Sequence, residues 1–237
     1  MTQGIVIQQT RRDEVVVEVS RPPDNSFTVE MCDTLSDLLG QPPQGAHVLR
    51  LRAEGEAFCL GRERSATDRP SAQRTVEALV RVTRGLAEST LVTIAEVGGD
   101  VAGFGVGLVA HCDVAVASDG ARFWFPEVEH DLAPALVLSW LPRVIGQRQA
   151  FWLTASAARL SADEAQQLGL VNFVVPAGQL AAKTDEVVAE LVRYPSQVHA
   201  QIKSNLRDFG ELTQAVAYRA ALDRLILSAV TGPPIPD

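Results

Sequence analysis

Residues 90–110 read TLVTIAEVGGDVAGFGVGLVA, which is the most informative stretch of the sequence. A buried strand runs into a glycine-rich turn, and the turn opens a helix that carries Gly103, Gly105 and Gly107. A glycine costs a helix about 1 kcal/mol relative to alanine, so three in its first turns need a reason. Either another backbone packs closely there, or free N–H groups at the helix start bind a ligand. A dinucleotide is disfavoured, because GFGVG has the spacing GxGxG and not GxGxxG.

Strands and helices alternate along the rest of the chain, which is typical of an α/β fold with mainly parallel strands. We expect further strands at 5–9, 14–19, 47–52, 113–117 and 121–125, the first two as a hairpin, and helices at 29–39, 74–88, 135–143 and 147–154. Thr28 and Ser161 are the expected N-caps of two helices, the second with Glu164 at the third helical position. The last third is mostly helical by pattern. We therefore divide the chain into a core of residues 1–180 and a helical region of residues 181–237.

The composition excludes several classes of protein. The 237 residues carry a formal charge of -8, which argues against a general nucleic-acid-binding protein. The three cysteines are widely spaced without a CxxC pair, so we expect neither a metal site nor a disulfide framework, and a reducing cytoplasm fits best. The N-terminus lacks the apolar region of a signal peptide, and no apolar run approaches the roughly 18 residues of a membrane span. We therefore expect no membrane partner.

Two further stretches follow strands and carry reactive side chains. Residues 55–64 read GEAFCLGRER, and the apolar pair before Cys59 indicates a backbone that turns inward. Residues 123–134 read FWFPEVEHDLAP, where Pro126 ends a strand directly before four ionisable residues, Glu127, Glu129, His130 and Asp131. On local sequence alone, such a run is more often a solvated loop than a site. The chain has no GxSxG, HExxH or phosphate-loop pattern, which argues against the hydrolytic and phosphate-binding classes that use them.

Five motifs, in order and at matching spacing, resemble those of the enoyl-CoA hydratase/isomerase (crotonase) superfamily. They are RPPDNSFTVEM (21–31), GEAFCLGRE (55–63), IAEVGGDVAGFGVGL (94–108), CDVAVASDGARFWFPEVEHDLAP (112–134) and LSADEAQQLGLVNFVVP (160–176). Each motif is weak by itself, but the five together cover nearly the whole chain. The resemblance implies a spiral of ββα units and a C-terminal helical region that mediates trimerisation, with trimers often pairing into hexamers. It also implies an acyl-CoA substrate and no further cofactor.

The resemblance implies roles for particular residues. In the family, two backbone N–H groups hold the thioester oxygen, and these donors map onto Cys59 and Phe104. Two preorganised donors, one at a helix N-terminus, stabilise an enolate oxygen more than the neutral ground state. Phe104 stands where the family has glycine, so its backbone must keep that geometry. Arg62 and Arg64 lie near the first donor, and we expect them to meet the phosphates of CoA.

Family hydratases use two glutamates, and this chain retains one of them. Glu127 matches the second glutamate, whereas Gly107 stands at the position of the first. One carboxylate in a desolvated pocket can move a proton between two carbons, so we favour isomerisation of 3-enoyl-CoA to 2-enoyl-CoA. Glu129, His130 or Asp131 could supply a second acid or base, which keeps hydration open. A catalytically impaired acyl-CoA-binding protein is the third alternative.

Overall fold

The larger of two sheets forms the frame on which the candidate site is built. The computed structural model describes residues 4–9 and 13–231. Across these residues, the sheet has the order β1 (Ile5–Gln9), β2 (Glu14–Val19), β3 (Val48–Ala53), β5 (Val92–Val97), β7 (Val114–Ser118) and β10 (Phe173–Val175). β1 and β2 form the expected antiparallel hairpin, although residues 10–12 of its turn lie outside the described residues. All other neighbours are parallel, as expected.

A smaller sheet lies beyond the carboxyl ends of these strands. Its strands are β4 (Ala57–Cys59), β6 (Asp100–Ala102), β8 (Arg122–Trp124) and β9 (Leu160–Ser161). β4, β6 and β8 each follow a strand of the larger sheet and pair in parallel with one another. Two such strand pairs run on into a helix, so the chain repeats a ββα unit. This confirms the expected spiral of ββα units.

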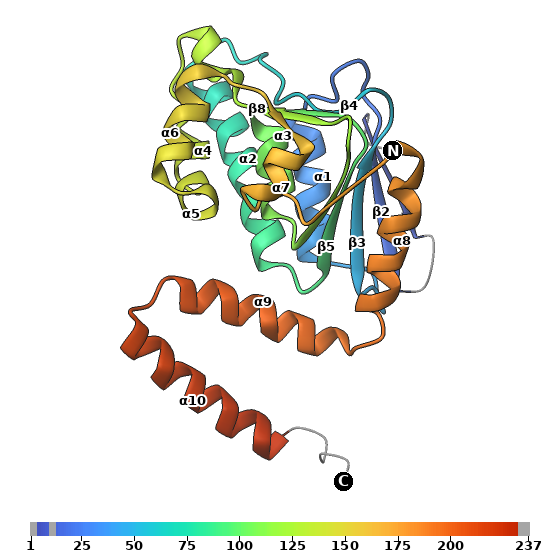
Figure 1. Cartoon of the computed structure of the whole chain (residues 1–237), viewed down its shortest axis with the longest axis vertical. Coiled ribbons are helices and arrows are strands. Elements are labelled where there is room, and N and C mark those ends of the chain that lie inside the picture. Colours follow the sequence, from blue (N-terminus) through green and yellow to red (C-terminus); the bar gives the residue numbers. More distant parts are fainter. Residues whose placement is uncertain (1–3, 10–12, 232–237) are drawn as a thin grey trace.

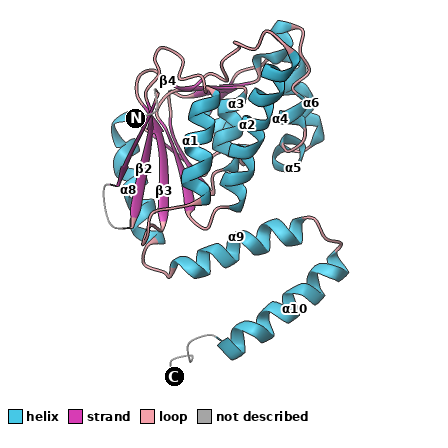
Figure 2. Ribbon diagram, turned by 180° about the vertical axis from the view of Figure 1, so that it is seen from behind, coloured by secondary structure: helices cyan, strands magenta, loops and turns pink. Residues whose placement is uncertain are grey.

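Helices cover both faces of the larger sheet. Figures 1 and 2 show α1 (Val29–Gly40), α2 (Arg69–Glu88) and α3 (Phe104–His111) on one face and α8 (Leu180–Leu191) on the other. Thr28 caps α1 as expected, because its side chain accepts a hydrogen bond from the backbone of Met31. α2 begins five residues earlier than residue 74, because Asp68 and Ser71 form a reciprocal capping box.

The helix expected over residues 135–143 is wrong, because the chain forms two short helices there. These are α4 (Ala135–Leu138) and α5 (Leu141–Ile145), and α6 (Gln147–Ser156) follows. Pro142 has no N–H to donate to the carbonyl of Leu138, and its ring would clash with that carbonyl. A proline is tolerated in the first turn of a new helix, so the chain breaks at Ser139 and Trp140 and restarts.

The C-terminal part is helical, as expected. α7 (Ala162–Gln167) has the expected capping box of Ser161 and Glu164. The short helix η2 (Ala177–Gln179), α8, α9 (Ser196–Gly210) and α10 (Gln214–Thr231) come later in the chain. Val188 of α8 is buried against β3 and β5 together with Val48, Val92 and Ile94. α9 contacts α2 and β5, whereas α10 extends away from the sheets (Figure 1).

Candidate active site

A cavity of about 310 Å³ lies where the turns after β4, β6 and β8 converge. Its walls come from the loop after β4, from α2, from the start of α3, and from the segment between β8 and α5. The lining side chains are mostly apolar, and among the described residues the ionisable ones are Arg62, Arg64 and Glu127. A mostly apolar pocket with a few polar groups is the usual form of a small-molecule site.

Glu127 lies on the single-turn helix η1 (Pro126–His130), which begins as soon as β8 has ended. Its atom Oε2 is buried without a hydrogen-bond partner among the described residues. Burial raises the pKa of the Glu127 carboxyl above its ordinary value, although Arg64 and Arg62 act in the opposite direction. A carboxylate with a raised pKa next to an apolar cavity is suited to accepting and returning a proton.

Phe104, the first residue of α3, lines the cavity. Gly103 has φ 52 and ψ -116, a conformation that side chains disfavour, and a Cβ atom there would lie 3.0 Å from Oε1 of Glu127. The N–H group of Gly103 donates to Trp124, while those of Val106 and Gly107 donate to the carbonyl of Gly103. Within the described structure, the Phe104 N–H has no backbone acceptor. Phe104 therefore keeps a free donor at a helix N-terminus, where the helix dipole favours negative charge.

Cys59 does not line this cavity. It is fully buried at the end of β4, where a Cβ atom on Gly105 would lie 2.1 Å from its carbonyl oxygen. Gly105 is thus explained by close backbone packing, the first of the two reasons that the glycine pattern left open. The wall of the cavity is formed instead by Leu60, Gly61 and Arg62, which follow Cys59 in the chain.

The hydrogen bonds of this loop leave the N–H group of Arg62 available. The N–H of Leu60 donates to Asp24 at 2.8 Å, and that of Glu63 donates to Phe27 at 2.8 Å. Phe27 in turn donates to Gly61, which makes an isolated parallel bridge between Phe27 and Arg62. Between these pairs, the Arg62 N–H has no backbone acceptor in the described part of the chain. The sequence pattern alone did not indicate this donor.

The other three ionisable residues of the loop lie away from this cavity. Glu129 and His130 are exposed and line an adjoining cavity of about 570 Å³, which Arg62 and Arg64 also line. Asp131 is exposed in a left-handed conformation and faces a third hollow beside α6. Of the described carboxylates, Glu127 alone lines the 310 Å³ cavity.

Trp140 is a cavity residue that the sequence reading missed. It lies at the break between α4 and α5, and its ring is the nearest atom group to a Cβ placed on Gly107, at 3.8 Å. The ring packs edge-on against His111, with ring centres 5.2 Å apart. Pro142 is the signal that could have revealed the break and therefore the inward position of Trp140.

The described residues form neither a metal-binding cluster nor a membrane-spanning helix. No group of three or more histidine, cysteine, aspartate or glutamate side chains is arranged to hold a metal ion in that part of the chain. No helix within the described ranges has the length and apolar character needed to cross a membrane.

Known proteins share both the sequence pattern and the fold. The family model described as enoyl-CoA hydratase/isomerase matches residues 12–230. A similar relative is (7aS)-7a-methyl-1,5-dioxo-2,3,5,6,7,7a-hexahydro-1H-indene-carboxyl-CoA hydrolase of Rhodococcus jostii, which is 30% identical over 217 residues, 86% of this chain and 80% of the relative. Mevalonyl-coenzyme A hydratase of Aspergillus fumigatus is 33% identical over 153 residues, 62% of this chain and 56% of that protein. An enoyl-CoA hydratase structure from Mycobacterium smegmatis has a TM-score of 0.90 at 26% identity, covering 95% of this chain and 90% of the other.

Proposed function

The chain belongs to the enoyl-CoA hydratase/isomerase family, and we propose that it isomerises 3-enoyl-CoA thioesters to 2-enoyl-CoA thioesters. One observation carries the proposal. Among the described residues, a single carboxylate, that of Glu127, lines the apolar cavity, and the position of the second family glutamate is Gly107. Moving a double bond needs one group that takes a proton from one carbon and returns it to another, and Glu127 has that position.

The reaction balances without water or a second acid. The Glu127 carboxylate takes a proton from C2, and the electron pair of the broken C–H bond moves into the thioester, which becomes a dienolate. The same proton then goes to C4, and the double bond is left between C2 and C3. The negative oxygen formed in between is held by the N–H groups of Arg62 and Phe104. We assign the first donor to Arg62, because Arg62 lines the cavity and its N–H has no backbone acceptor among the described residues, while Cys59 lies in the core.

Arg62 and Arg64 are also proposed to bind the phosphates of CoA. Both line the catalytic cavity and the adjoining one, and neither forms an ion pair with a described carboxylate. The Arg62 guanidinium has one long hydrogen bond, to the carbonyl of Glu63 at 3.5 Å. Guanidinium groups without a carboxylate partner are suited to phosphate, which they bind through paired hydrogen bonds. The acyl group would then occupy the 310 Å³ cavity, with the CoA tail leaving past the two arginines.

Hydration of 2-enoyl-CoA is the second candidate. The names of several relatives favour it, since mevalonyl-coenzyme A hydratase and further enoyl-CoA hydratases are similar to this chain. In the structure, hydration would require Glu129 or His130 to act from the adjoining cavity, because both lie outside the one that holds Glu127.

A substrate panel distinguishes the candidates. The purified protein is incubated with 3-enoyl-CoA and 2-enoyl-CoA esters, and products are followed by mass and by ultraviolet absorbance. Isomerisation leaves the mass unchanged and creates the absorbance of a conjugated enoyl thioester, whereas hydration adds the mass of water and removes that absorbance. We expect the first result. Conversion of 2-enoyl-CoA alone would replace the proposal with hydration, and tight binding without turnover would indicate an acyl-CoA-binding protein.

A further inference from the structure

We propose that Trp140 keeps water out of the Gly107 side of the catalytic cavity and thereby makes the proton on Glu127 return to the substrate. This inference rests on the proposed isomerisation and names the residue that controls its outcome. A protonated Glu127 has two possible partners, the C4 atom of the dienolate or a water molecule. Which one it meets depends on what fills the cavity around it.

Gly107 and Trp140 together form part of the wall of the catalytic cavity. Gly107 has no side chain, and the space in front of its Cα is bounded by the indole ring of Trp140, 3.8 Å from an ideal Cβ position. A carboxylate at residue 107 would hold water in this region by hydrogen bonding. The chain instead has the benzene edge of the Trp140 indole there, with Cζ2 as its nearest atom, and such a carbon atom offers water no hydrogen bond of comparable strength.

The indole is held in place from several sides. The break between α4 and α5 fixes its backbone, and the Trp140 N–H donates to the carbonyl of Val137 at 3.2 Å. His111 meets the ring edge-on, and Phe125 packs behind it with ring centres 6.4 Å apart. The Nδ1 atom of His111 lies 2.7 Å from the carbonyl of Gly107 and so donates to it. Burial lowers the pKa of His111, so the imidazole ring of His111 is neutral at neutral pH.

The residues next to Trp140 extend the same apolar wall. Ala133, Pro134, Ala135, Leu136 and Val137 all line the cavity, and none has a polar side chain. The Oε2 atom of Glu127 is buried, and it has no protein hydrogen-bond partner in the described structure. Removing the indole would open space for ordered water beside Gly107, because polar carbonyl and carboxylate oxygens are then within reach.

Isotope transfer tests the proposal directly. With 3-enoyl-CoA carrying deuterium at C2 in ordinary water, a dry site returns the deuterium to C4, and mass spectrometry finds it in the product. We expect transfer in the wild type, its loss by exchange with water in Trp140→Ala, and its retention in Trp140→Phe. Equal transfer in the wild type and in Trp140→Ala would overturn the proposal.

A second measurement does not depend on turnover. Carbon-13 labelling of glutamate allows NMR titration of Glu127, whose signal is identified by its disappearance in Glu127→Gln. If Trp140 excludes water, the Glu127 pKa falls toward the ordinary glutamate value in Trp140→Ala and stays raised in Trp140→Phe. An unchanged pKa in Trp140→Ala rejects water exclusion even if the protein isomerises. If the wild type does not isomerise but the pKa falls, the proposed function and the proton return fail, whereas the exclusion of water by Trp140 stands.

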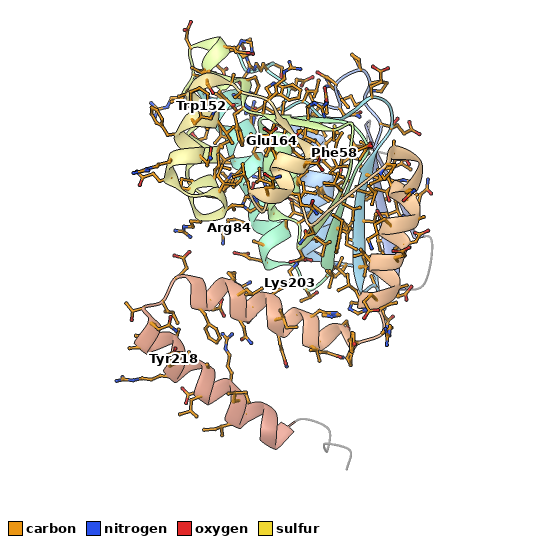
Figure 3. All side chains as sticks on the ribbon, viewed as in Figure 1. Phe58, Arg84, Trp152, Glu164, Lys203 and Tyr218 are labelled. Carbon is orange, nitrogen blue, oxygen red and sulfur yellow. The ribbon has the colours of Figure 1, made fainter. Side chains whose placement is uncertain are left out.

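Two controls keep the experiment interpretable. Trp152→Ala removes an indole from the exposed outer side of α6, where Figure 3 shows it pointing away from the sheets, and should change neither readout. Trp140→Gln covers the case in which Trp140→Ala does not fold, because its longer side chain fills part of the space while its amide binds water. It should also lose the deuterium.

Discussion

At the scale of single residues, the Glu127 carboxylate carries the proposed chemistry. Glu127→Gln keeps the size of the side chain but cannot accept a proton. We expect turnover of 3-enoyl-CoA to fall by roughly 10²–10⁴-fold, the usual contribution of a positioned acid/base group, with much less effect on binding of a saturated acyl-CoA. Steady-state kinetics measures the turnover, and calorimetry measures the binding of the saturated acyl-CoA. Glu129→Gln, an exposed neighbour outside the cavity, serves as the control. A loss of less than about twofold in Glu127→Gln would remove Glu127 from the mechanism.

Two glycines of α3 offer a second test at this scale. Gly105→Ala places a Cβ atom 2.1 Å from the carbonyl oxygen of Cys59, which is backbone and cannot move aside easily. We expect it to lower the free energy of unfolding by about 1–3 kcal/mol or more, the usual range for overpacking. Gly107→Ala meets Trp140 only at 3.8 Å and should be neutral or stabilising by up to about 1 kcal/mol. Thermal unfolding compares them, and equal stability of the two variants would contradict the packing argument.

Sequence patterns predicted the residues whose role depends on near neighbours. Thr28 and Ser161 cap helices through contacts three residues away, and the Pro126–Glu127 pair follows directly from the strand before it. The choice between Cys59 and Arg62 as a backbone donor could not be read in this way. It depends on Asp24 and Phe27, more than thirty positions earlier, which take up the other N–H groups of the loop. Long-range pairing of this kind leaves no local pattern.

At the scale of secondary-structure elements, α9 is attached to the core by polar groups. Lys203 is 9% exposed, and Figure 3 shows it pointing from α9 toward the sheets. Its ammonium group contacts the carbonyls of Leu86 and Leu91 and forms an ion pair of 2.7 Å with Asp113. Near the start of α9, the rings of His47 and His199 stack, with Nε2 of the former 2.8 Å from Nδ1 of the latter.

The two histidines predict a pH dependence of stability. Burial lowers the pKa of His47, and the neighbouring His199 lowers it further, while Asp13 acts in the opposite direction. The unfolded chain, with a histidine pKa of about 6.5, therefore binds more protons than the folded one as pH falls. We expect the free energy of unfolding to decrease below about pH 6.5 and to level off below the folded pKa of His47. Denaturant titrations between pH 5 and 8 measure this, and His47→Gln should flatten the slope. An equal slope in that variant would assign the effect to other groups.

At the scale of the whole molecule, the C-terminal helices leave an apolar surface uncovered. In Figures 1 and 3, α10 and its Tyr218 lie away from the sheets. Among the described side chains of α9 and α10, the large apolar ones that are exposed are Val198, Ile202, Leu206, Val216, Tyr218, Leu222, Leu225, Ile226 and Leu227. The helical spacing of apolar residues after residue 180 predicts an apolar surface of Val187, Val188, Leu191, Val192, Leu222, Leu225, Ile226 and Val230. Val188 is instead buried under the larger sheet, and the side chain of Val230 lies outside the described residues.

An uncovered surface of this kind predicts self-association. Soluble monomers rarely expose apolar patches of more than a few hundred Å². We therefore expect another copy of this chain to cover the apolar surface of α9 and α10. We expect sedimentation at micromolar concentration to give a trimer or a pair of trimers. Leu222→Glu should shift the protein to smaller species, whereas Arg219→Gln on the same helix should not. A wild-type monomer at these concentrations would contradict the expectation.

The contact between Gly107 and Trp140 also constrains the order in which this site can change. A Cβ atom fits at residue 107, but a glutamate side chain there would start against the indole 3.8 Å away. Gly107→Glu alone therefore introduces a carboxylate without room for the water it would activate, and Trp140→Ala alone opens the room without the carboxylate. The two substitutions are coupled, because they act on one shared space. Neither single substitution would therefore give two-carboxylate chemistry by itself. The Trp140 indole thus makes this active site difficult to convert by one mutation at a time.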